Sequence, residues 1–462
     1  MFKFQISIYF LLVSIFLVYN AVFFNLFSYK QANFDTENNK FEPPVAQNSA
    51  IINGRLILVL IDALRYDFIF ESNVAKEKLR MPFVNRVIRE QKAIPFKLIA
   101  NPPTVTLPRL KALVSGIIPE FIDILWNFNT TYLAEDNIIR QFNLQNSPVI
   151  FYGDDTWLKL FRPNESFVRY EGTTSFMASD YDQVDFNVTR HLAFELEQTD
   201  WKVMILHYLG LDHVGHIEGP YAPFNIRRKL HEMDEIIKKI YSNLNRNDLM
   251  LVLSDHGMAN EGGHGGSSHM EITTPLLLLS KGLFGSKFTY ADDQKFNSLI
   301  ENIKEKKQID LVSTLSCLFG LNVPYHNKGT VFLSDLTEYF DKSLRNYSLE
   351  ANCLVRNWKQ LDRLLDLGQH EIELVRMLDK KSLADAEEFL KIKVESKVKV
   401  ENIKSEQNKF LILLILIMFM LLFVYAIDQS NSRPFTNPFS CLLALLIFLS
   451  KQTFIKALLF TF

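Results

Sequence analysis

The chain has 462 residues, a formal net charge of -2 at pH 7 and 48% hydrophobic residues. It is too apolar for an intrinsically disordered chain, and its balanced charge, without a basic block, gives no support for nucleic-acid binding. Aromatic residues make up 13% of the chain, and many of its 39 phenylalanines lie near the two ends, which indicates contact with a membrane.

The N-terminal segment is uncharged from Phe4 to Tyr29 and is long enough to cross a hydrocarbon core of roughly 30 Å. Bulky residues near its end, such as Phe23 and Phe24, do not suit cleavage of a signal peptide. We therefore expect an uncleaved transmembrane anchor at residues 1–29. The polar stretch with a double proline that follows predicts a linker at residues 30–50.

A strand and a helix are predicted directly after this linker. Residues 55–64 form a nearly continuous aliphatic run with Asp62 near its end, which predicts a buried parallel strand. Residues 81–91 favour a helix. Asp62 should therefore lie at the carboxyl end of a strand, where α/β proteins bind their ligands.

Residues 101–119 carry two threonines, Thr104 and Thr106, between prolines at positions 102, 103 and 108. The prolines predict an extended approach to a helix at residues 107–114, so that Thr104 or Thr106 lies near the helix N-terminus. Oriented backbone N–H groups at such a position favour an anion such as a phosphoryl group.

Residues 147–153 predict a further strand, which ends at Asp154 and Asp155. Adjacent carboxylates point in different directions, so we expect them to position substrate or to support the site rather than to share a metal ion. We assign the same supporting role to His213 and His269.

The next predicted strand, residues 202–208, is followed by a loop at residues 209–219. This loop carries Asp212 and His216, four residues apart. Apolar residues at helical spacing then predict an amphipathic helix at residues 225–244.

The last chemistry-bearing strand is predicted at residues 249–253 and leads into Asp255 and His256. Glycines flank His264 a few residues later and allow a tight loop around an ion or a phosphate. Residues 274–280 predict one more strand. Strands that alternate with helices indicate an α/β layered fold.

The C-terminal part is helical and then apolar. Leucine, lysine and glutamate at helical spacing over residues 361–399 predict a helical stalk, which we place at residues 351–409. Residues 410–427 form a second uncharged span, and a third apolar run begins at Phe439. We expect transmembrane segments at residues 410–462 and an incomplete membrane region, because the third run is interrupted by lysines.

Three cysteines and four sequons bear on the compartment. Cys317 and Cys353 form no zinc-binding pattern, so that either a disulfide or two separate thiols fit them. Glycosylation sequons between the first two spans favour a lumenal or extracellular domain, and they lie at Asn129, Asn164, Asn187 and Asn346.

Carboxylates and imidazoles at these strand ends and in the loops that follow them predict a metal centre: Asp62, Asp212, His216, Asp255, His256 and His264. Three carboxylates and three imidazoles, without cysteine, suit two divalent ions. Zn²⁺ fits these donors best, and Mn²⁺ fits them less well. Two ions about 4 Å apart can hold the attacking and leaving oxygens of an in-line displacement at phosphorus.

The order of these residues resembles the alkaline phosphatase superfamily. The resemblance implies an α/β/α sandwich with a mostly parallel central sheet, here with transmembrane helices at both ends. It implies one ion held by Asp62, Thr104, Asp255 and His256, and a second held by Asp212, His216 and His264. By the same resemblance Thr104 is the expected nucleophile. The superfamily's sulfatase motif is absent from this sequence.

Longer runs resemble the GPI ethanolamine phosphate transferases, among them IDALRYDF, PPTVTLPRLKALVSG, LHYLGLDHVGH and LSDHGM. The segment YEGTTSF looks most like the branch that modifies the second mannose. The resemblance implies a lumenal catalytic domain at residues 51–350 in the endoplasmic reticulum membrane. It implies transfer of phosphoethanolamine from phosphatidylethanolamine to a mannose of the GPI precursor, with a small membrane subunit as a candidate partner.

Two other functions remain open from the sequence. A lumenal metallophosphodiesterase or phosphatase would use the same residues with water as acceptor, and a non-catalytic membrane module would keep only the fold. As a weaker expectation, Asn127 donates a hydrogen bond to a phosphoryl oxygen of the substrate.

Overall fold

The protein is described by a computed structural model at residues 49–70, 81–119, 132–174, 177–285, 293–368, 370–380 and 382–400. The predicted anchor, nearly all of the linker and the spans from residue 410 lie outside these residues. Within the described ranges no helix combines the length and the hydropathy needed to cross a bilayer. Residues 42–396 form one compact unit.

An eight-stranded sheet forms the centre of this unit, with strand order β4-β3-β5-β1-β6-β7-β2-β8. Strand β7 is antiparallel to both of its neighbours, and the other pairings are parallel. The strands are β1 (Leu56–Ile61), β2 (Ala93–Ile99), β3 (Val149–Asp154), β4 (Arg169–Thr173), β5 (Val203–Tyr208), β6 (Leu249–Leu253), β7 (Thr273–Leu279) and β8 (Glu305–Lys307).

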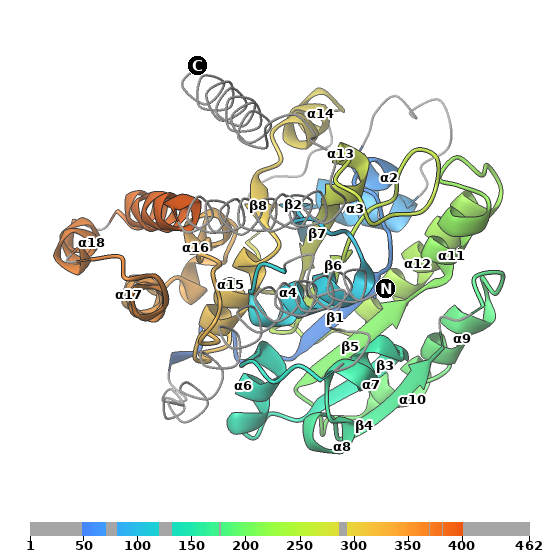
Figure 1. Cartoon of the computed structure of the whole chain (residues 1–462), viewed down its shortest axis with the longest axis horizontal. Helices are drawn as coiled ribbons and strands as arrows, with labels where there is room; N and C mark the ends of the chain where they lie inside the picture. Colours follow the sequence, from blue (N-terminus) through green and yellow to red (C-terminus); the bar gives the residue numbers. More distant parts are fainter. Residues whose placement is uncertain are drawn as a thin grey trace, which may run out of the picture. The chain divides into compact units, whose positions relative to one another are not determined.

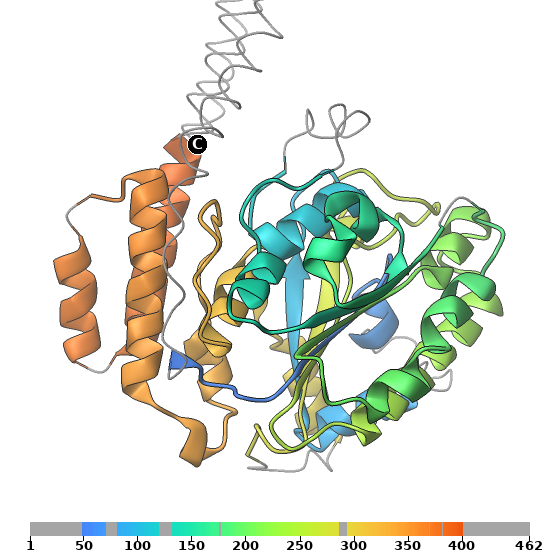
Figure 2. The same ribbon diagram turned by 90° about the horizontal axis from the view of Figure 1, so that it is seen from below.

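Helices cover both faces of the sheet because alternate residues of β1 are buried on opposite sides (Figures 1 and 2). Ile57, Val59 and Ile61 pack in the core of one face. The helices of that face are α2 (Asp67–Phe70), α3 (Pro82–Arg89), α9 (Gln183–Thr189), α10 (Leu192–Glu197), α11 (Gly210–Ile217), α12 (Asn225–Ser242) and α14 (Asp293–Glu301).

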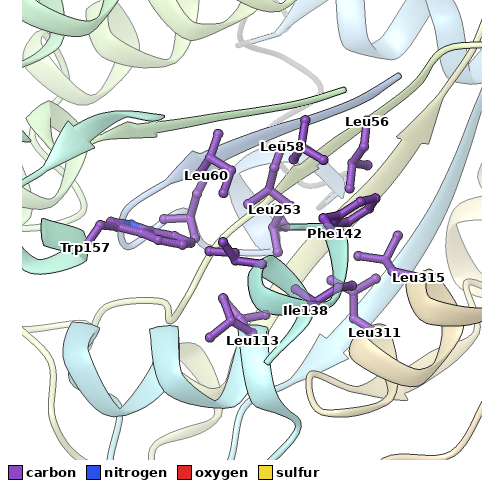
Figure 3. Close-up of a pocket in the computed structure, with 14 residues that line it drawn as sticks. Leu56, Leu58, Leu60, Leu113, Ile138, Phe142, Trp157, Leu253, Leu311 and Leu315 are labelled. Atoms are coloured by element: carbon purple, nitrogen blue, oxygen red, sulfur yellow. The ribbon is translucent and has the colours of Figure 1, made fainter. Parts of the chain in front are cut away.

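The opposite face carries Leu56, Leu58 and Leu60, which line a small apolar cavity of about 30 Å³ (Figure 3). Its other walls come from α4 (Thr106–Ser115), α6 (Ile138–Leu144), α7 (Thr156–Leu160) and α15 (Asp310–Leu318). A cavity of this size is far smaller than a ligand pocket and offers almost no polar surface, so it belongs to the core and is no substrate site.

The remaining helices lie outside these two layers or at strand ends. They are α8 (Pro163–Ser166), α13 (His269–Ile272), α16 (Leu333–Thr337), η3 (Lys342–Leu344), α17 (Tyr347–Leu365), α18 (Glu371–Asp379) and the helical residues 383–400. Cys317 in α15 and Cys353 in α17 form a disulfide, which resolves the choice left open by the sequence.

Most predicted elements are confirmed with small changes of boundary. Helix α4 begins one residue before the predicted start and ends at Ser115. Gly116 follows it in the left-handed conformation, with φ 72°, that glycine favours at a helix end. The prediction of a loop at residues 209–219 is wrong, because residues 210–217 form α11. Strands β2, β4 and β8 were missed, since charged residues or proline interrupt their apolar pattern.

Candidate metal centre

Parallel strands bring the predicted site residues to one edge of the sheet. Asp62 directly follows β1, and Asp255 and His256 follow β6, which pairs with β1 in register. Helix α11 begins two residues after β5, on the other side of β1, and carries Asp212 and His216 on one face. This placement follows from the parallel pairing of β5, β1 and β6, whose carboxyl ends lie at the same edge of the sheet.

The first group of candidate ligands is Asp62, Asp255 and His256, all fully buried or nearly so. The Nδ1 atom of His256 lies 2.8 Å from the carbonyl oxygen of Gly257. A carbonyl only accepts hydrogen bonds, so Nδ1 carries a proton and Nε2 is the nitrogen that can present a lone pair to a metal ion. That lone pair faces Asp255 Oδ2 at 3.2 Å and Asp62 Oδ1 at 3.5 Å.

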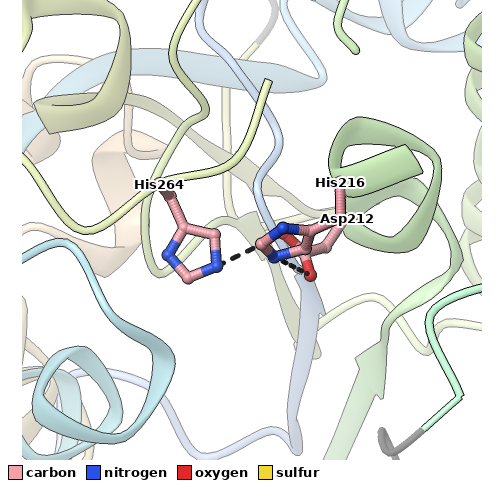
Figure 4. A group of neighbouring side chains, drawn as sticks. All are labelled: Asp212, His216 and His264. Atoms are coloured by element: carbon pink, nitrogen blue, oxygen red, sulfur yellow. Dashed lines mark ion pairs between the residues drawn. The ribbon is translucent and has the colours of Figure 1, made fainter. Parts of the chain in front are cut away.

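The second group is Asp212, His216 and His264 (Figure 4). His264 Nδ1 lies 2.7 Å from the carbonyl oxygen of Thr104, which again leaves the lone pair on Nε2. His264 Nε2 lies 3.7 Å from Asp212 Oδ1, and His216 Nε2 lies 3.4 Å from Asp212 Oδ2. The His216 side chain is 39% exposed, so the centre opens to solvent on this side.

The two groups adjoin each other through their histidines. The rings of His256 and His264 stack with centroids 3.9 Å apart, and those of His216 and His264 meet edge to face at 4.8 Å. The structure therefore brings all six predicted ligands together in two adjacent triads.

Burial and mutual repulsion shift the pKa values of these groups. Burial, with the charge of Asp255 as the next cause, raises the pKa of both Asp62 and Asp212 well above the usual value. Burial lowers the pKa of His216, and it lowers the pKa of His264 to about 4, with His256 adding to the effect. Burial thus favours the neutral form of His216 and His264, whose lone pairs lie beside carboxyl groups that are costly to ionise.

These residues fit divalent metal ions. Asp62 Oδ1 and Asp255 Oδ2 are buried without a hydrogen-bond donor anywhere in the described part of the chain. Two carboxylate oxygens and an unprotonated ring nitrogen that converge in this way repel one another unless a cation lies between them. Nitrogen and oxygen donors without cysteine suit Zn²⁺ and, less well, Mn²⁺.

The two threonines before α4 have different surroundings. Thr104 is fully buried, and its hydroxyl donates to Gly266 O at 2.9 Å and accepts from Gly265 N at 3.0 Å. Thr106 is only partly buried at the first position of α4, and its hydroxyl lies 3.4 Å from His256 Nε2. The geometry therefore favours Thr106 over the predicted Thr104 as the hydroxyl beside the first group.

Thr104 instead helps to fix the glycine-rich loop that carries His264. Glu271 accepts hydrogen bonds from Gly266 N at 2.7 Å and from Ser268, whose hydroxyl lies at 2.6 Å, in a capping box at the start of α13. The hydroxyl of Thr104 also lies 3.2 Å from Glu271 Oε1. This network holds the loop, and with it His264, in position.

The remaining predicted residues lie apart from the triads or outside the described residues. Asn127 and the sequon at Asn129 belong to residues 120–131, which are not described. Asn164 and Asn346 are exposed and Asn187 is partly exposed. The supporting role expected for His213 remains a prediction, and its Nδ1 donates to Asp180 O at 2.7 Å.

A third group joins Asp62 to two residues that sequence reasoning did not place in the centre, Asp154 and His207, with one polar atom of each within 4.8 Å of the others. All three are buried. The sequence did contain a signal for these two residues: His207 lies near the end of the otherwise apolar β5, and Asp154 ends the otherwise apolar β3.

Residues 56–271 match the family described as type I phosphodiesterase / nucleotide pyrophosphatase. This range contains the parallel core strands, both triads and both threonines. The segment is therefore similar to the domains of this family, and its mostly parallel sheet and six polar residues agree with that similarity.

The predicted resemblance to GPI ethanolamine phosphate transferases is confirmed, and the chain is a homologue of them. It is 40% identical over 326 residues to GPI ethanolamine phosphate transferase 2 of Kluyveromyces lactis. That alignment covers 68% of this chain and 40% of the relative. It is also 40% identical over 308 residues to the human GPI ethanolamine phosphate transferase 2, catalytic subunit. That alignment covers 63% of this chain and 30% of the relative. The chain thus spans less than half the length of these relatives.

Among solved structures, the C-terminal periplasmic domain of EcEptC from Escherichia coli is similar with a TM-score of 0.43 and 14% identity, over 62% of this chain and 87% of that one. A likeness of this size adds nothing to the family assignment.

Proposed function

We propose that this chain is a membrane-anchored transferase that moves phosphoethanolamine from phosphatidylethanolamine to a mannose hydroxyl of the GPI precursor. One observation carries the proposal: two triads of carboxylates and histidines adjoin a hydroxyl at a helix N-terminus. The 40% identity to ethanolamine phosphate transferases supports the choice of substrates, with the second mannose as the proposed acceptor.

The six residues would hold two divalent ions, one in each triad, with Zn²⁺ the best fit. Such ions supply charge for the phosphoryl oxygens and make a nearby hydroxyl easier to ionise. The chain itself orients the reacting groups, because the triads come from the ends of strands, from α11 and from the loop of His264, which hydrogen bonds to Thr104 and Glu271 hold in place.

Thr106 is the proposed nucleophile, in place of Thr104. Its oxygen attacks phosphorus and the bond from phosphorus to the diacylglycerol oxygen breaks, with the threonine proton ending on diacylglycerol. The mannose hydroxyl then attacks the same phosphorus, releases Thr106 and returns a proton to it. Backbone N–H groups in the first turn of α4 stabilise the phosphoryl charge in both steps.

The proposed location is the endoplasmic reticulum membrane, with the catalytic domain in the lumen. Sequons at Asn164 and Asn346 on the surface support this orientation, since glycosylation takes place there. The buried disulfide between Cys317 and Cys353 supports it further, because disulfides persist in oxidising compartments.

The test compares two single variants of the full chain incubated with phosphatidylethanolamine. We expect Thr106→Ala to abolish both the phosphoethanolamine adduct and transfer, because the variant lacks the hydroxyl that lies 3.4 Å from His256 Nε2. Thr104→Ala should keep the adduct and lose at most about tenfold in rate, since it loosens only the loop of His264. Mass spectrometry of the peptide that contains both threonines identifies the modified residue.

Thr106→Ser serves as the conservative control and should retain the adduct. Modification of Thr104 in the wild-type chain, or full activity in Thr106→Ala, would show that Thr104 is the nucleophile after all. Release of free phosphoethanolamine without transfer to the glycolipid would identify water as the acceptor instead.

A further inference from the structure

His207 lies in β5 behind the first triad and joins two residues that are far apart in the sequence. Its Nε2 atom lies 3.2 Å from Asp62 Oδ2, and its Nδ1 atom lies 3.0 Å from Trp157 Nε1. His207 and Trp157 are completely buried and Asp62 is 1% exposed. The rings of His207 and Trp157 stand at 81°, so the indole N–H meets the edge of the imidazole.

The indole fixes the protonation of His207. A tryptophan Nε1–H can only donate, so Nδ1 of His207 accepts and carries no proton. The proton of the neutral imidazole is therefore on Nε2 and is donated to Asp62 Oδ2. An imidazolium is excluded by the same contact, because two N–H groups would then face each other at 3.0 Å.

His207 is thus protonated on the opposite nitrogen from two histidines of the triads, His256 and His264, whose Nδ1 atoms donate to carbonyl oxygens. His256 and His264 donate from Nδ1 and present a lone pair at Nε2, as a metal ligand must. To bind an ion through Nε2 while Trp157 occupies Nδ1, His207 would have to lose its last proton. The group of Asp62, Asp154 and His207 is therefore unsuited to a third ion, although its polar atoms are close enough for one.

We infer that His207 is a positioning residue that holds the carboxylate of Asp62 through one oxygen, Oδ2. The other oxygen, Oδ1, is thereby directed toward Asp255 and His256, the other two members of the first triad. Trp157 contributes to this role because its hydrogen bond selects the His207 tautomer that can donate to Asp62. The inference rests on the metal centre of the proposed function and adds two residues to it that do not touch the ions.

The surrounding backbone fits a fixed imidazole at this place. A Cβ atom built on Gly153 of β3 would lie 2.6 Å from Cβ of His207, so only glycine allows the two strands to approach here. Asp154 follows directly and has one oxygen 3.0 Å from Thr156 N, which holds it at the start of α7 next to Trp157. The ring of His207 is therefore enclosed by β3 and α7 and has little room to turn.

The experiment measures binding of Zn²⁺ to the full-length, metal-stripped chain, without any need for turnover. A His264→Ala background, which should lose the ion of the second triad, restricts the titration to the ion held by Asp62. In that background we expect His207→Ala to weaken Zn²⁺ binding by about 10- to 100-fold, as removal of a group that orients a ligand does. His207→Gln should bind nearly as well as its parent, because its amide can donate to Asp62 and accept from Trp157.

Trp157→Phe should weaken the same ion less than His207→Ala does. Trp201→Phe is the matched control, since Trp201 is also buried and its Nε1 donates to the carbonyl oxygen of Glu195 at 2.9 Å, away from the triads. This control should leave Zn²⁺ binding unchanged. The two conservative variants keep the inference testable even when His207→Ala does not fold.

Two outcomes would overturn the inference while leaving the proposed function intact. Unchanged Zn²⁺ affinity in His207→Ala would remove the positioning role. Three ions in the wild-type chain, with one lost equally in His207→Ala and His207→Gln, would make His207 a ligand. A wild-type chain that binds no divalent ion would instead remove the metal centre and the proposed function with it.

Discussion

At the scale of single residues, the partner of each histidine Nδ1 atom decides what that histidine can do. Backbone carbonyls beside His256 and His264 leave their Nε2 atoms free to bind a cation. The indole of Trp157 turns His207 into a donor. Residues of one type within a single strand-end cluster therefore have opposite roles, which their burial alone does not distinguish.

The second triad provides a prediction at this scale. His264→Ala should lower the metal content of the purified chain from two ions to one, because Asp212 and His216 alone leave an incomplete ligand set. Elemental analysis of the protein before and after dialysis measures the content. His269→Ala is the control, since His269 lies at the start of α13 outside both triads, and it should keep two ions. Two ions retained in His264→Ala would contradict the assignment.

At the scale of elements, short helices carry more of the site than their sequences indicate. Helix α11 has only eight residues, yet it brings Asp212 and His216 onto one face at i, i+4 spacing. A loop with the same two residues would not fix their separation. The short helix α16 has a different role, away from the site: the buried Glu387 of the helical residues from 383 accepts hydrogen bonds from the backbone N–H and the hydroxyl of its Ser334.

This contact predicts a pH dependence of stability. Burial raises the pKa of Glu387 to about 7 in the folded protein, against the usual value of 4.5. The folded state therefore binds the proton of Glu387 more tightly than the unfolded state does. The resulting contribution to the free energy of unfolding is fully present below pH 4.5 and is lost as the pH rises through about 7. The loss is on the order of 3 kcal/mol.

The neutral isostere Glu387→Gln should remove this dependence. It should be more stable than the wild type at pH 8, and the difference should vanish toward pH 4.5, where both side chains are neutral. Urea unfolding of both proteins at several pH values measures it. Glu388→Gln is an exposed control on the next position of the same helix and should follow the wild type. A variant that is less stable at pH 8 would contradict the prediction.

At the scale of the whole molecule, a layered core fixes the sheet edge on which the site is built. Strands β1, β5 and β6 are buried on both faces, and helices from both layers enclose them. The disulfide then ties α15, which packs on the sheet, to α17. Both cysteines are completely buried or nearly so.

Removal of this disulfide should destabilise the domain without touching the site. Cys317→Ala together with Cys353→Ala opens a link between residues 36 apart in sequence. It should cost about 2–5 kcal/mol and lower the melting temperature by several degrees, while the zinc content stays unchanged. Peptide mapping without reductant should recover the two cysteine peptides linked. Alkylation of both thiols in the untreated protein would contradict the pairing.

Much of the core could be read from the sequence, because strands buried on both faces appear as uninterrupted apolar runs. Strand β6 matches its predicted bounds, and β1, β3, β5 and β7 differ only slightly. Strand β4 was missed because charged and small residues dominate it at the edge of the sheet. Helix α11 was missed because it is short and its glycines weaken the helical pattern.

The sequence by itself determined the six candidate ligands and the α/β class, because carboxylates and histidines that follow apolar strands must meet at one edge of a parallel sheet. Only the tertiary structure decided which threonine faces His256, since that contact joins residues 150 apart and depends on where α4 begins. It also decided the role of His207. The tautomer of a buried imidazole is set by neighbours such as Trp157, which packing brings together across the fold and no local pattern encodes.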